Sequence, residues 1–351
     1  MKTVLLTLSL LLGVGPVAAH QGVDRDIAAA LAAGDVRKAT AAYAALVART
    51  GLPAPDALKA IANAAAAPLV RDRSLPVQIA ACGIVLAAQV GAPECQAVID
   101  GIARRGGTGD DQALDIYRLA NAGYRPWPNL FPTFEQSMKP QTRVEVVDSA
   151  RRLPAAERVA ILGPVFTDDR ELAAQSRAAG LLAEIGSPEA IALLKSKLTK
   201  PGSPMPRLPV LIALAQTGDA DAIRQTEMLR TSVGGRDAME VGLALGIAGS
   251  MLGPKPEAVL DAAEGREKVH IALLLDKKRP EPARKAIRDV AAAQAPDHRQ
   301  AAMRAAGMLG MGGEGFVLDR LLDPDPIVRI AAAHAVLHTA DVLRGGRLPT
   351  P

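Results

Sequence analysis

Short segments of this chain recur at a common spacing. Residues 177–182 (Arg-Ala-Ala-Gly-Leu-Leu) recur at 304–309 (Arg-Ala-Ala-Gly-Met-Leu), an offset of 127 residues. Residues 185–191 (Ile-Gly-Ser-Pro-Glu-Ala-Ile) are echoed at 217–223, an offset of 32. Because 127 is close to four times 32, one period of about 32 residues accounts for both offsets. A period of this length is typical of arrays in which each repeat must stack on its neighbours to bury its apolar face.

One repeat unit shows why the expected elements are helices. Several apolar residues of 174–185 fall at helical spacing on one face (Ala174, Ala178, Leu181, Leu182, Ile185). Gly186 follows as a residue that tolerates the left-handed conformation of a helix end, and Ser187 can cap the next helix. Ile191, Leu194 and Leu198 then line that second helix. We therefore predict an α-solenoid of stacked antiparallel helix pairs over residues 20–351.

The composition agrees with an all-α fold. Hydrophobic residues make up 49% of the chain, but aromatic residues only 2%. Alanine supplies much of the apolar content, and it is the best helix former. Alanine buries little area per residue, so such a core needs many stacked helices. Runs with period 2, the signal of half-buried strands, are missing.

The segment 321–337 resembles the start of a HEAT-like repeat, of the kind found in phycobilisome-lyase-type repeat proteins. In such families an Asp at the turn and an Arg early in the next helix form a polar ladder along the stack, and Asp323 and Arg329 match that pair. Asp169 matches the first half, with Gln175 in place of the Arg. The first unit, from Ala32 to Leu46, also resembles a tetratricopeptide repeat, which implies the same helix-pair architecture.

Two proline-rich connections interrupt the predicted array, near 124–140 and at 200–209. Proline at this density is incompatible with the interior of a helix. The first connection holds four aromatic residues that form a candidate site for a protein partner, since aromatics are enriched at interface hot spots. The alternative is that these aromatics fill the core where the repeat is irregular. The four residues are Tyr124, Trp127, Phe131 and Phe134.

Residues 1–19 have the pattern of a signal peptide: Lys2, an apolar run over 4–12, and small residues at 17–19. We predict cleavage after Ala19 and a periplasmic or secreted protein without a further membrane-inserted segment. The signal holds one Lys and no acid, so the mature chain has 40 basic against 37 acidic residues, a net charge of +3. That balance argues against nucleic-acid binding.

Cys82 and Cys95 are the two cysteines of the chain. An even count in an exported protein is typical of a disulfide. A symmetric hairpin about a turn near Gly91 would instead place Cys82 opposite a residue near 100, too far from Cys95 for a bridge. A disulfide and a pair of buried thiols both stay open at this point.

The expected function is that of a non-catalytic protein-interaction scaffold or assembly factor of the bacterial cell envelope, without a cofactor. The sequence contains no phosphate-binding loop, nucleophile elbow or recognisable pair of catalytic acids. The alternative is a metal-binding enzyme or an accessory factor of an enzyme. His334 and His338 lie four residues apart on one expected helix, and signal cleavage would make His20 the first residue. No third ligand accompanies either, so no metal site is assigned from the sequence.

Overall fold

The structure is a computed structural model that describes residues 23–88, 93–104, 155–169, 171–199, 207–276 and 278–344, with residues 143, 144, 147 and 150. Within these residues every regular element is a helix. In chain order the helices are α1 (Arg25–Ala32), α2 (Val36–Thr50), α3 (Pro55–Ala66), η1 (Ala67–Arg71), α4 (Leu75–Ala87), α5 (Pro93–Arg104), α9 (Ala155–Asp168), α10 (Leu172–Ile185), α11 (Pro188–Thr199), α12 (Arg207–Thr217), α13 (Ala220–Leu229), α14 (Gly235–Ala248), α15 (Pro256–Ala262), α16 (Gly265–Leu275), α17 (Pro280–Ala291), α18 (Pro296–Met308), α19 (Gly315–Asp319), η4 (Arg320–Leu322) and α20 (Pro326–Leu343).

The ends of the helices follow the expected local chemistry. Gly186 ends α10 with a φ of 63°, in the left-handed region that favours glycine. Ser187 caps α11, and its hydroxyl accepts from the Ala190 amide at 3.3 Å. The predicted apolar stripe of α10 is fully buried at Ala174, Leu181 and other positions. The helix-pair unit predicted from the sequence is therefore confirmed.

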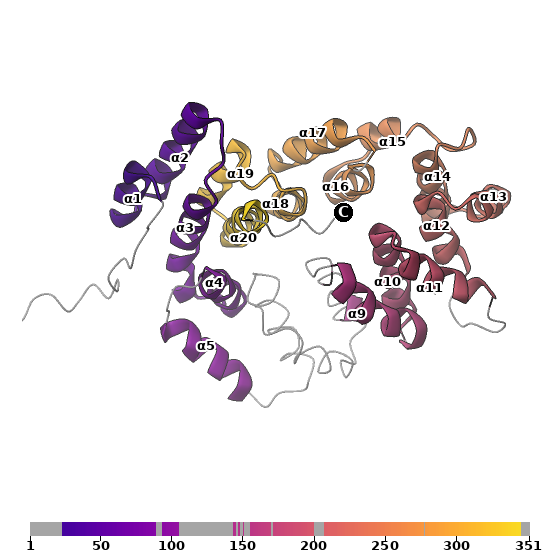
Figure 1. The fold of residues 1–351 in the computed structure, drawn as a ribbon, viewed down its shortest axis with the longest axis horizontal. Coiled ribbons are helices and arrows are strands. Elements are labelled where there is room, and N and C mark those ends of the chain that lie inside the picture. Colours follow the sequence, from indigo (N-terminus) through magenta and orange to yellow (C-terminus); the bar gives the residue numbers. More distant parts are fainter. Residues whose placement is uncertain are drawn as a thin grey trace, which may run out of the picture.

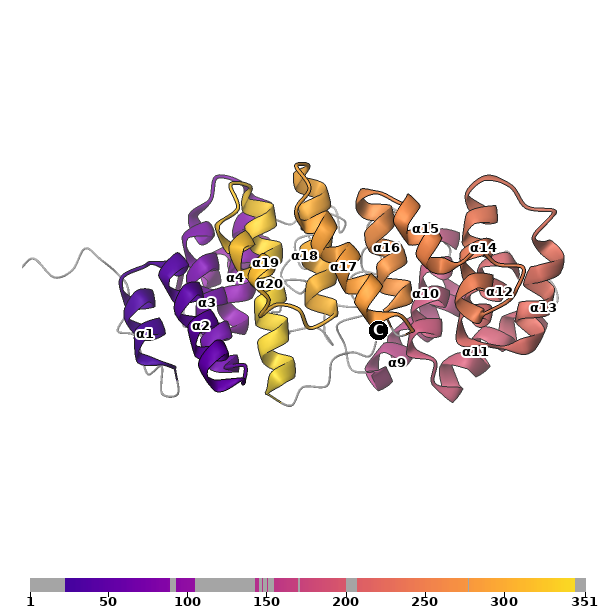
Figure 2. The same ribbon diagram turned by 90° about the horizontal axis from the view of Figure 1, so that it is seen from above.

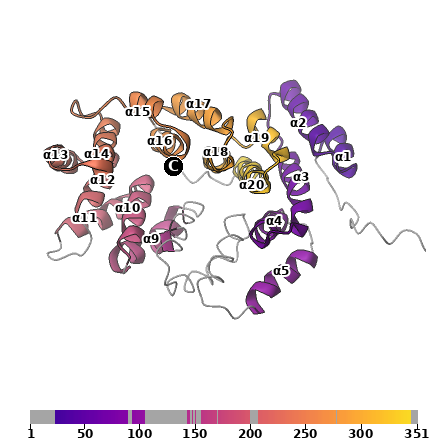
Figure 3. The ribbon, with the colours of Figure 1, turned by 180° about the vertical axis from the view of Figure 1, so that it is seen from behind.

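The described helices follow an arc of two rows (Figure 1). Helices α16, α18 and α20 lie on the inner side of the arc, and α15, α17 and α19 lie outside them, as the view from behind also shows (Figure 3). Seen from above, the helices stand side by side along the arc (Figure 2). The predicted all-α solenoid is confirmed, but a constant period of 32 residues is not.

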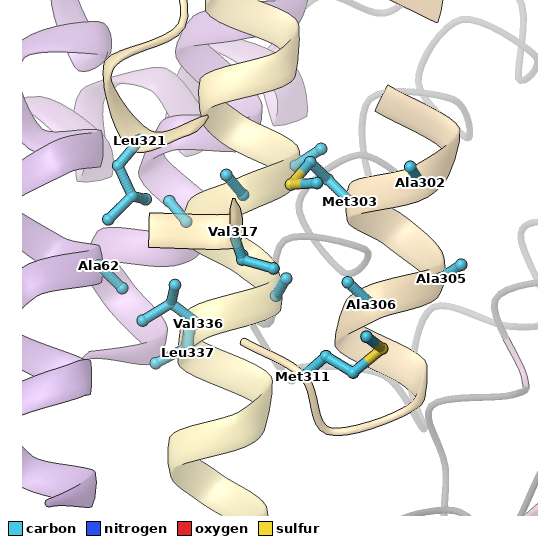
Figure 4. Close-up of a cluster of buried hydrophobic side chains, with 14 of the residues drawn as sticks. Ala62, Ala302, Met303, Ala305, Ala306, Met311, Val317, Leu321, Val336 and Leu337 are labelled. Atoms are coloured by element: carbon cyan, nitrogen blue, oxygen red, sulfur yellow. The ribbon is translucent and has the colours of Figure 1, made fainter. Parts of the chain in front are cut away.

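The N-terminal and C-terminal units pack against each other. Helix α20 lies between α18 and α3, so the last helix of the array contacts a helix near its beginning. Figure 4 shows Ala62 of α3 facing Val336 and Leu337 of α20. These residues belong to one hydrophobic core that runs from Ile27 to Cys95 and from Leu243 to Ala340. The junction therefore buries apolar faces that the terminal units of an open array would expose to water.

Polar contacts also hold this junction. Arg344, which follows α20, forms an ion pair with Asp56 in the first turn of α3. Tyr43 of α2 is buried against the turn that precedes α19, where a Cβ atom on Gly313 would lie 3.1 Å from the Tyr43 hydroxyl oxygen. Three N-terminal helices thus contact the C-terminal unit, since α2, α3 and α4 all touch it.

Glycines permit the closest approaches between α18, α20 and the turn between them. A Cβ atom on Gly307 of α18 would lie 3.0 Å from the Cα atom of Ala335 of α20. A Cβ atom on Gly312 would lie 2.3 Å from the Ala335 carbonyl oxygen. The Gly312 amide also donates to the Thr339 hydroxyl at 2.9 Å. The position of α20 in the arc therefore depends on small residues at these two points.

The structure describes only a small part of the two predicted proline-rich connections. The first, near 124–140, lies outside the described residues. Of the second, 200–206 also lie outside them, while 207–209 form the first turn of α12. Pro209 is tolerated there because a proline in the first turn removes no hydrogen bond from the helix.

Candidate functional site

Helix α20 is the element on which the described candidate residues lie. Its start is fixed by Asp325, whose carboxylate accepts from the amides of Ile327 at 2.8 Å and Val328 at 3.2 Å. Pro326 occupies the first helical position, where its missing N–H costs nothing. The helix then runs to Leu343 through alanine, valine and leucine, held between α18 and α3. This packing leaves one partly accessible stripe on α20.

His334 and His338 both lie on that stripe and are half-buried. Their rings are nearly parallel, with an interplanar angle of 11° and a centroid separation of 6.1 Å. The neighbours of α20 cover its other faces, and α20 stands in the inner row of the arc (Figure 1). The two imidazoles therefore lie together on the part of α20 that its neighbours leave partly accessible.

Asp323 precedes α20 and is held in a buried ion pair with Arg299 of α18. The Arg299 Nε donates to Asp323 Oδ2 at 2.8 Å, and a terminal nitrogen donates to Oδ1 at 2.9 Å. Arg320 adds a second bond to Oδ2 at 3.2 Å. Burial raises the Asp323 pKa, but the hydrogen bonds from Arg299 and the Asp325 amide, with the charges of Arg299 and Arg320, outweigh it and lower the pKa below its ordinary value.

The same arrangement recurs at Asp169, which precedes α10. The Arg143 Nε donates to Asp169 Oδ1 at 3.0 Å, and both side chains are more than nine-tenths buried. Arg143 lies 26 residues before Asp169 in the chain, and Arg299 lies 24 residues before Asp323. Each ion pair joins the Asp before a helix to an Arg of an earlier segment, and the two pairs are called the ladder below.

The arginine of that ladder is not the one expected from the sequence. Asp323 contacts Arg299 of the preceding helix, whereas the Nε of Arg329 is buried without a hydrogen-bond partner. In three units a side chain early in the helix donates to the backbone carbonyl six positions before it, in the preceding turn. Gln78 donates to the Asp72 carbonyl, Gln175 to the Asp169 carbonyl and Arg299 to the Ala293 carbonyl. Arg329 is likewise six positions after Asp323.

The predicted partner-binding aromatics are not part of this geometry. Tyr124, Trp127, Phe131 and Phe134 lie outside the described residues, and so does His20. Of the residues singled out from the sequence, the structure therefore brings together His334 and His338 on one stripe. Arg299 and Arg143 were missed, although their spacing from Asp323 and Asp169 could have indicated them.

A pocket of about 510 Å³ lies against α13 and the loop after α14. Its charged residues already have partners, since Arg224 pairs with Asp221 and Glu227 accepts from the Ser250 hydroxyl. Met228 and Leu252 give it an apolar wall. It holds no His or Cys among its lining residues, and α13 is remote from α20 in both Figure 1 and Figure 2.

The described residues lack two further features, a metal-binding cluster and a membrane-spanning helix. They contain no cluster of three or more His, Cys, Asp or Glu that could hold a metal ion. Nor does any helix in that part of the chain have the length and apolar character needed to span a bilayer.

No protein-family model matches the chain, and no curated protein matches it significantly. Among solved structures, the chain is similar to human deoxyhypusine hydroxylase in complex with glycerol. The identity is 15%, the match covers 76% of this chain and 96% of that chain, and the TM-score is 0.30. A TM-score of this size supports no transfer of activity, substrate or cofactor from that enzyme.

The prediction of a non-catalytic protein-interaction scaffold is corrected at this point. The solved structure found by comparison is that of an enzyme, whereas the sequence predicted a chain without catalytic activity. The four aromatics on which partner binding was placed lie outside the described residues, so they give no support for it. We therefore set the scaffold interpretation aside in favour of the alternative, metal binding.

Proposed function

We propose that this chain is a metal-binding enzyme or an accessory factor of an enzyme, with His334 and His338 as protein ligands to a divalent transition metal ion. The observation that carries the proposal is the pair of nearly parallel imidazoles on the accessible stripe of α20. Helical zinc sites bind their metal through two histidines that lie four residues apart on one face of the helix, and His334 and His338 have this spacing. Imidazole nitrogen is also a preferred ligand of copper and nickel.

The arrangement favours an open site over a closed structural one. Structural zinc sites take four protein ligands, whereas catalytic sites leave positions for water or substrate. Two histidines leave at least two positions of a tetrahedral ion for other ligands. The described residues add no third His, Cys, Asp or Glu to the pair. The proposed ion is therefore one that polarises or activates a small molecule.

The packing of α20 supports this role. Ligands on a rigid helix are placed more accurately than ligands on a loop. Helix α20 is fixed on both flanks by α18 and α3, and at its start by the Asp325 cap. The junction between the terminal units thus holds the helix that carries both histidines.

Metal titration of purified protein tests the proposal. Protein without a histidine tag is stripped of metal, and binding of Zn²⁺ and Cu²⁺ is measured by calorimetry at neutral pH. We expect one ion per chain, and at least about tenfold weaker binding in His334→Ala and in His338→Ala. His270→Ala is the matched control, because His270 is an exposed histidine on α16, an inner helix separated from α20 by α18. Unchanged affinity in both α20 variants, or no binding by the wild type, would overturn the proposal.

We also infer that the chain is an exported HEAT-like repeat protein, which is periplasmic or secreted. The stacked helix pairs and the Asp323 ladder support the family, and the composition of residues 1–19 supports export. We expect the intact mass of the exported protein to equal that of a chain that begins at His20. The mass of a chain that begins at Met1 would contradict export. The expected protein partner stays a prediction, as do the absence of nucleic-acid binding and of membrane insertion.

A further inference from the structure

Cys82 and Cys95 lie on two consecutive helices that pack together. Cys82 is in the second half of α4, and Cys95 is in the first turn of α5. Both side chains are completely buried and belong to the same hydrophobic core. A hydrogen-bond interaction with the other thiol is the largest cause of the pKa shift of each. The structure therefore places in one core two residues whose pairing the sequence left open.

The two cysteines lie at the core of the contact between these helices. The side chains around Cys95 on α5 are exposed at Pro93, Glu94, Gln96 and Ala97. An exposed ion pair between Arg71 and Glu94, at 2.7 Å, adds a polar contact beside the sulfurs. Among the described elements α5 packs substantially against α4 alone. The attachment of α5 therefore depends on few buried groups, of which Cys95 is one.

We propose that Cys82 and Cys95 are a modification site at which the two thiols are oxidised to an intramolecular disulfide that fixes α5 to α4. The oxidant is a small or protein disulfide of the glutathione or thioredoxin-like class. Such oxidants act in the compartment to which residues 1–19 are expected to direct the chain. The inference does not depend on metal binding by the histidines of α20.

The two thiols are suited to different steps of the exchange. The hydrogen bond from Cys82 lowers the pKa of Cys95, and the same bond, with burial, raises the pKa of Cys82. Cys95 is therefore the thiol that ionises first, and as a thiolate it attacks one sulfur of the oxidant and displaces one thiolate. Cys82 then loses its proton and attacks the Cys95 sulfur, which releases the second thiolate. The cysteines give up two protons and two electrons, and the oxidant becomes two thiols.

Burial does not prevent this exchange. Helix α5 makes its substantial described contact with α4, so a local opening that separates these two helices exposes the edge of the core that holds the thiols. Reclosure then brings the two cysteines back into one buried cluster, which favours the second step over reaction with another oxidant molecule.

Intact mass and thermal stability of the full chain test the proposal. Reduced wild-type protein is incubated with oxidised glutathione, and free thiols are counted under denaturing conditions. We expect no free thiol, no glutathione adduct, and an intact mass about 2 Da lower than that of the reduced chain. We also expect reduction to lower the Tm of the oxidised wild type by on the order of 5 °C, because the bridge closes a loop of roughly 15 residues.

The double variant Cys82→Ala/Cys95→Ala is the control, and its Tm should not respond to reductant. The single variant Cys82→Ala should accumulate one mixed disulfide with glutathione, since its partner thiol is absent. Two glutathione adducts on the wild type, two persistent free thiols, or a disulfide only between chains would each overturn the proposal. These readouts use the wild-type protein, so they hold even if a cysteine variant fails to fold.

Discussion

The variant Gly312→Ala is expected to lose about 3 kcal/mol of unfolding free energy, a large effect for one added methyl group. The new Cβ atom would lie 2.3 Å from the Ala335 carbonyl oxygen and 2.6 Å from the Thr339 hydroxyl oxygen. The first of these is backbone of α20, so relief requires α20 or the turn to move. That movement would also stretch the buried hydrogen bond from the Gly312 amide to Thr339. Chemical denaturation followed by circular dichroism measures the loss.

Gly315→Ala is the matched control for this variant. Gly315 begins α19 three residues later, and an added Cβ atom there would meet no atom within 4 Å. Alanine also favours the helix, so we expect a change within about 0.5 kcal/mol. Equal destabilisation by the two variants would contradict the close approach of the turn to α20.

The variant Asp323→Ala is expected to lose about 3–5 kcal/mol, because it leaves the buried Arg299 guanidinium without its carboxylate. It also removes the acceptor of the Asp325 amide at the start of α20. The double variant Asp323→Leu/Arg299→Met should lose much less than the sum of the single variants, since no unpaired charge remains. Urea denaturation of the wild type, Asp323→Leu, Arg299→Met and the double variant yields this coupling energy.

The exposed pair Lys285 and Asp289 provides the control for the buried pair. Both lie on α17, and their side chains are 75% and 50% exposed, so Lys285→Ala should cost at most about 0.5 kcal/mol. A loss at Asp323→Ala as small as that one would show that the buried pair contributes nothing beyond a surface contact.

The pH dependence of the Asp323 contribution follows from its lowered pKa. A carboxyl whose folded-state pKa is depressed contributes its full stability above its unfolded-state pKa and loses it as pH falls through the folded-state pKa. The ordinary value is 3.8, so the stability difference between wild type and Asp323→Asn should be constant from neutral pH to about 4. Below that pH the difference should shrink, and growth of the difference on acidification would contradict the assignment.

The sequence allowed the helices to be predicted because their signals are local. The apolar spacing in α10, the left-handed Gly186 and the Ser187 cap act within a few residues of one another. The contact between α20 and α3 has no such signal. Helix α3 presents alanine, leucine and isoleucine, and α20 presents alanine, valine and leucine. An apolar face of such a composition does not specify which other face it will meet.

The ladder was predictable only in part, for a related reason. The role of Asp323 follows from the turn in which it stands, but its partner comes from the unit before it. The six-residue spacing of Asp323 and Arg329 recurs at Asp72 and Gln78 and at Asp169 and Gln175. In both of these pairs the later side chain donates to the backbone carbonyl of the Asp, across the turn. The spacing therefore indicates a side-chain bond to the backbone within one unit and not an ion pair along the stack. The two cysteines are free and buried in the structure, as one of the two alternatives left open by the sequence had it.

We have proposed that His334 and His338 together hold one metal ion on α20. Pulsed electron paramagnetic resonance of mature protein loaded with one equivalent of Cu²⁺ tests it most directly, because the echo modulation counts coordinated imidazoles. We predict two imidazoles in the wild type and in His270→Ala, and one in each of His334→Ala and His338→Ala. Two imidazoles that persist in the His334→Ala/His338→Ala double variant would place the copper elsewhere and contradict the claim.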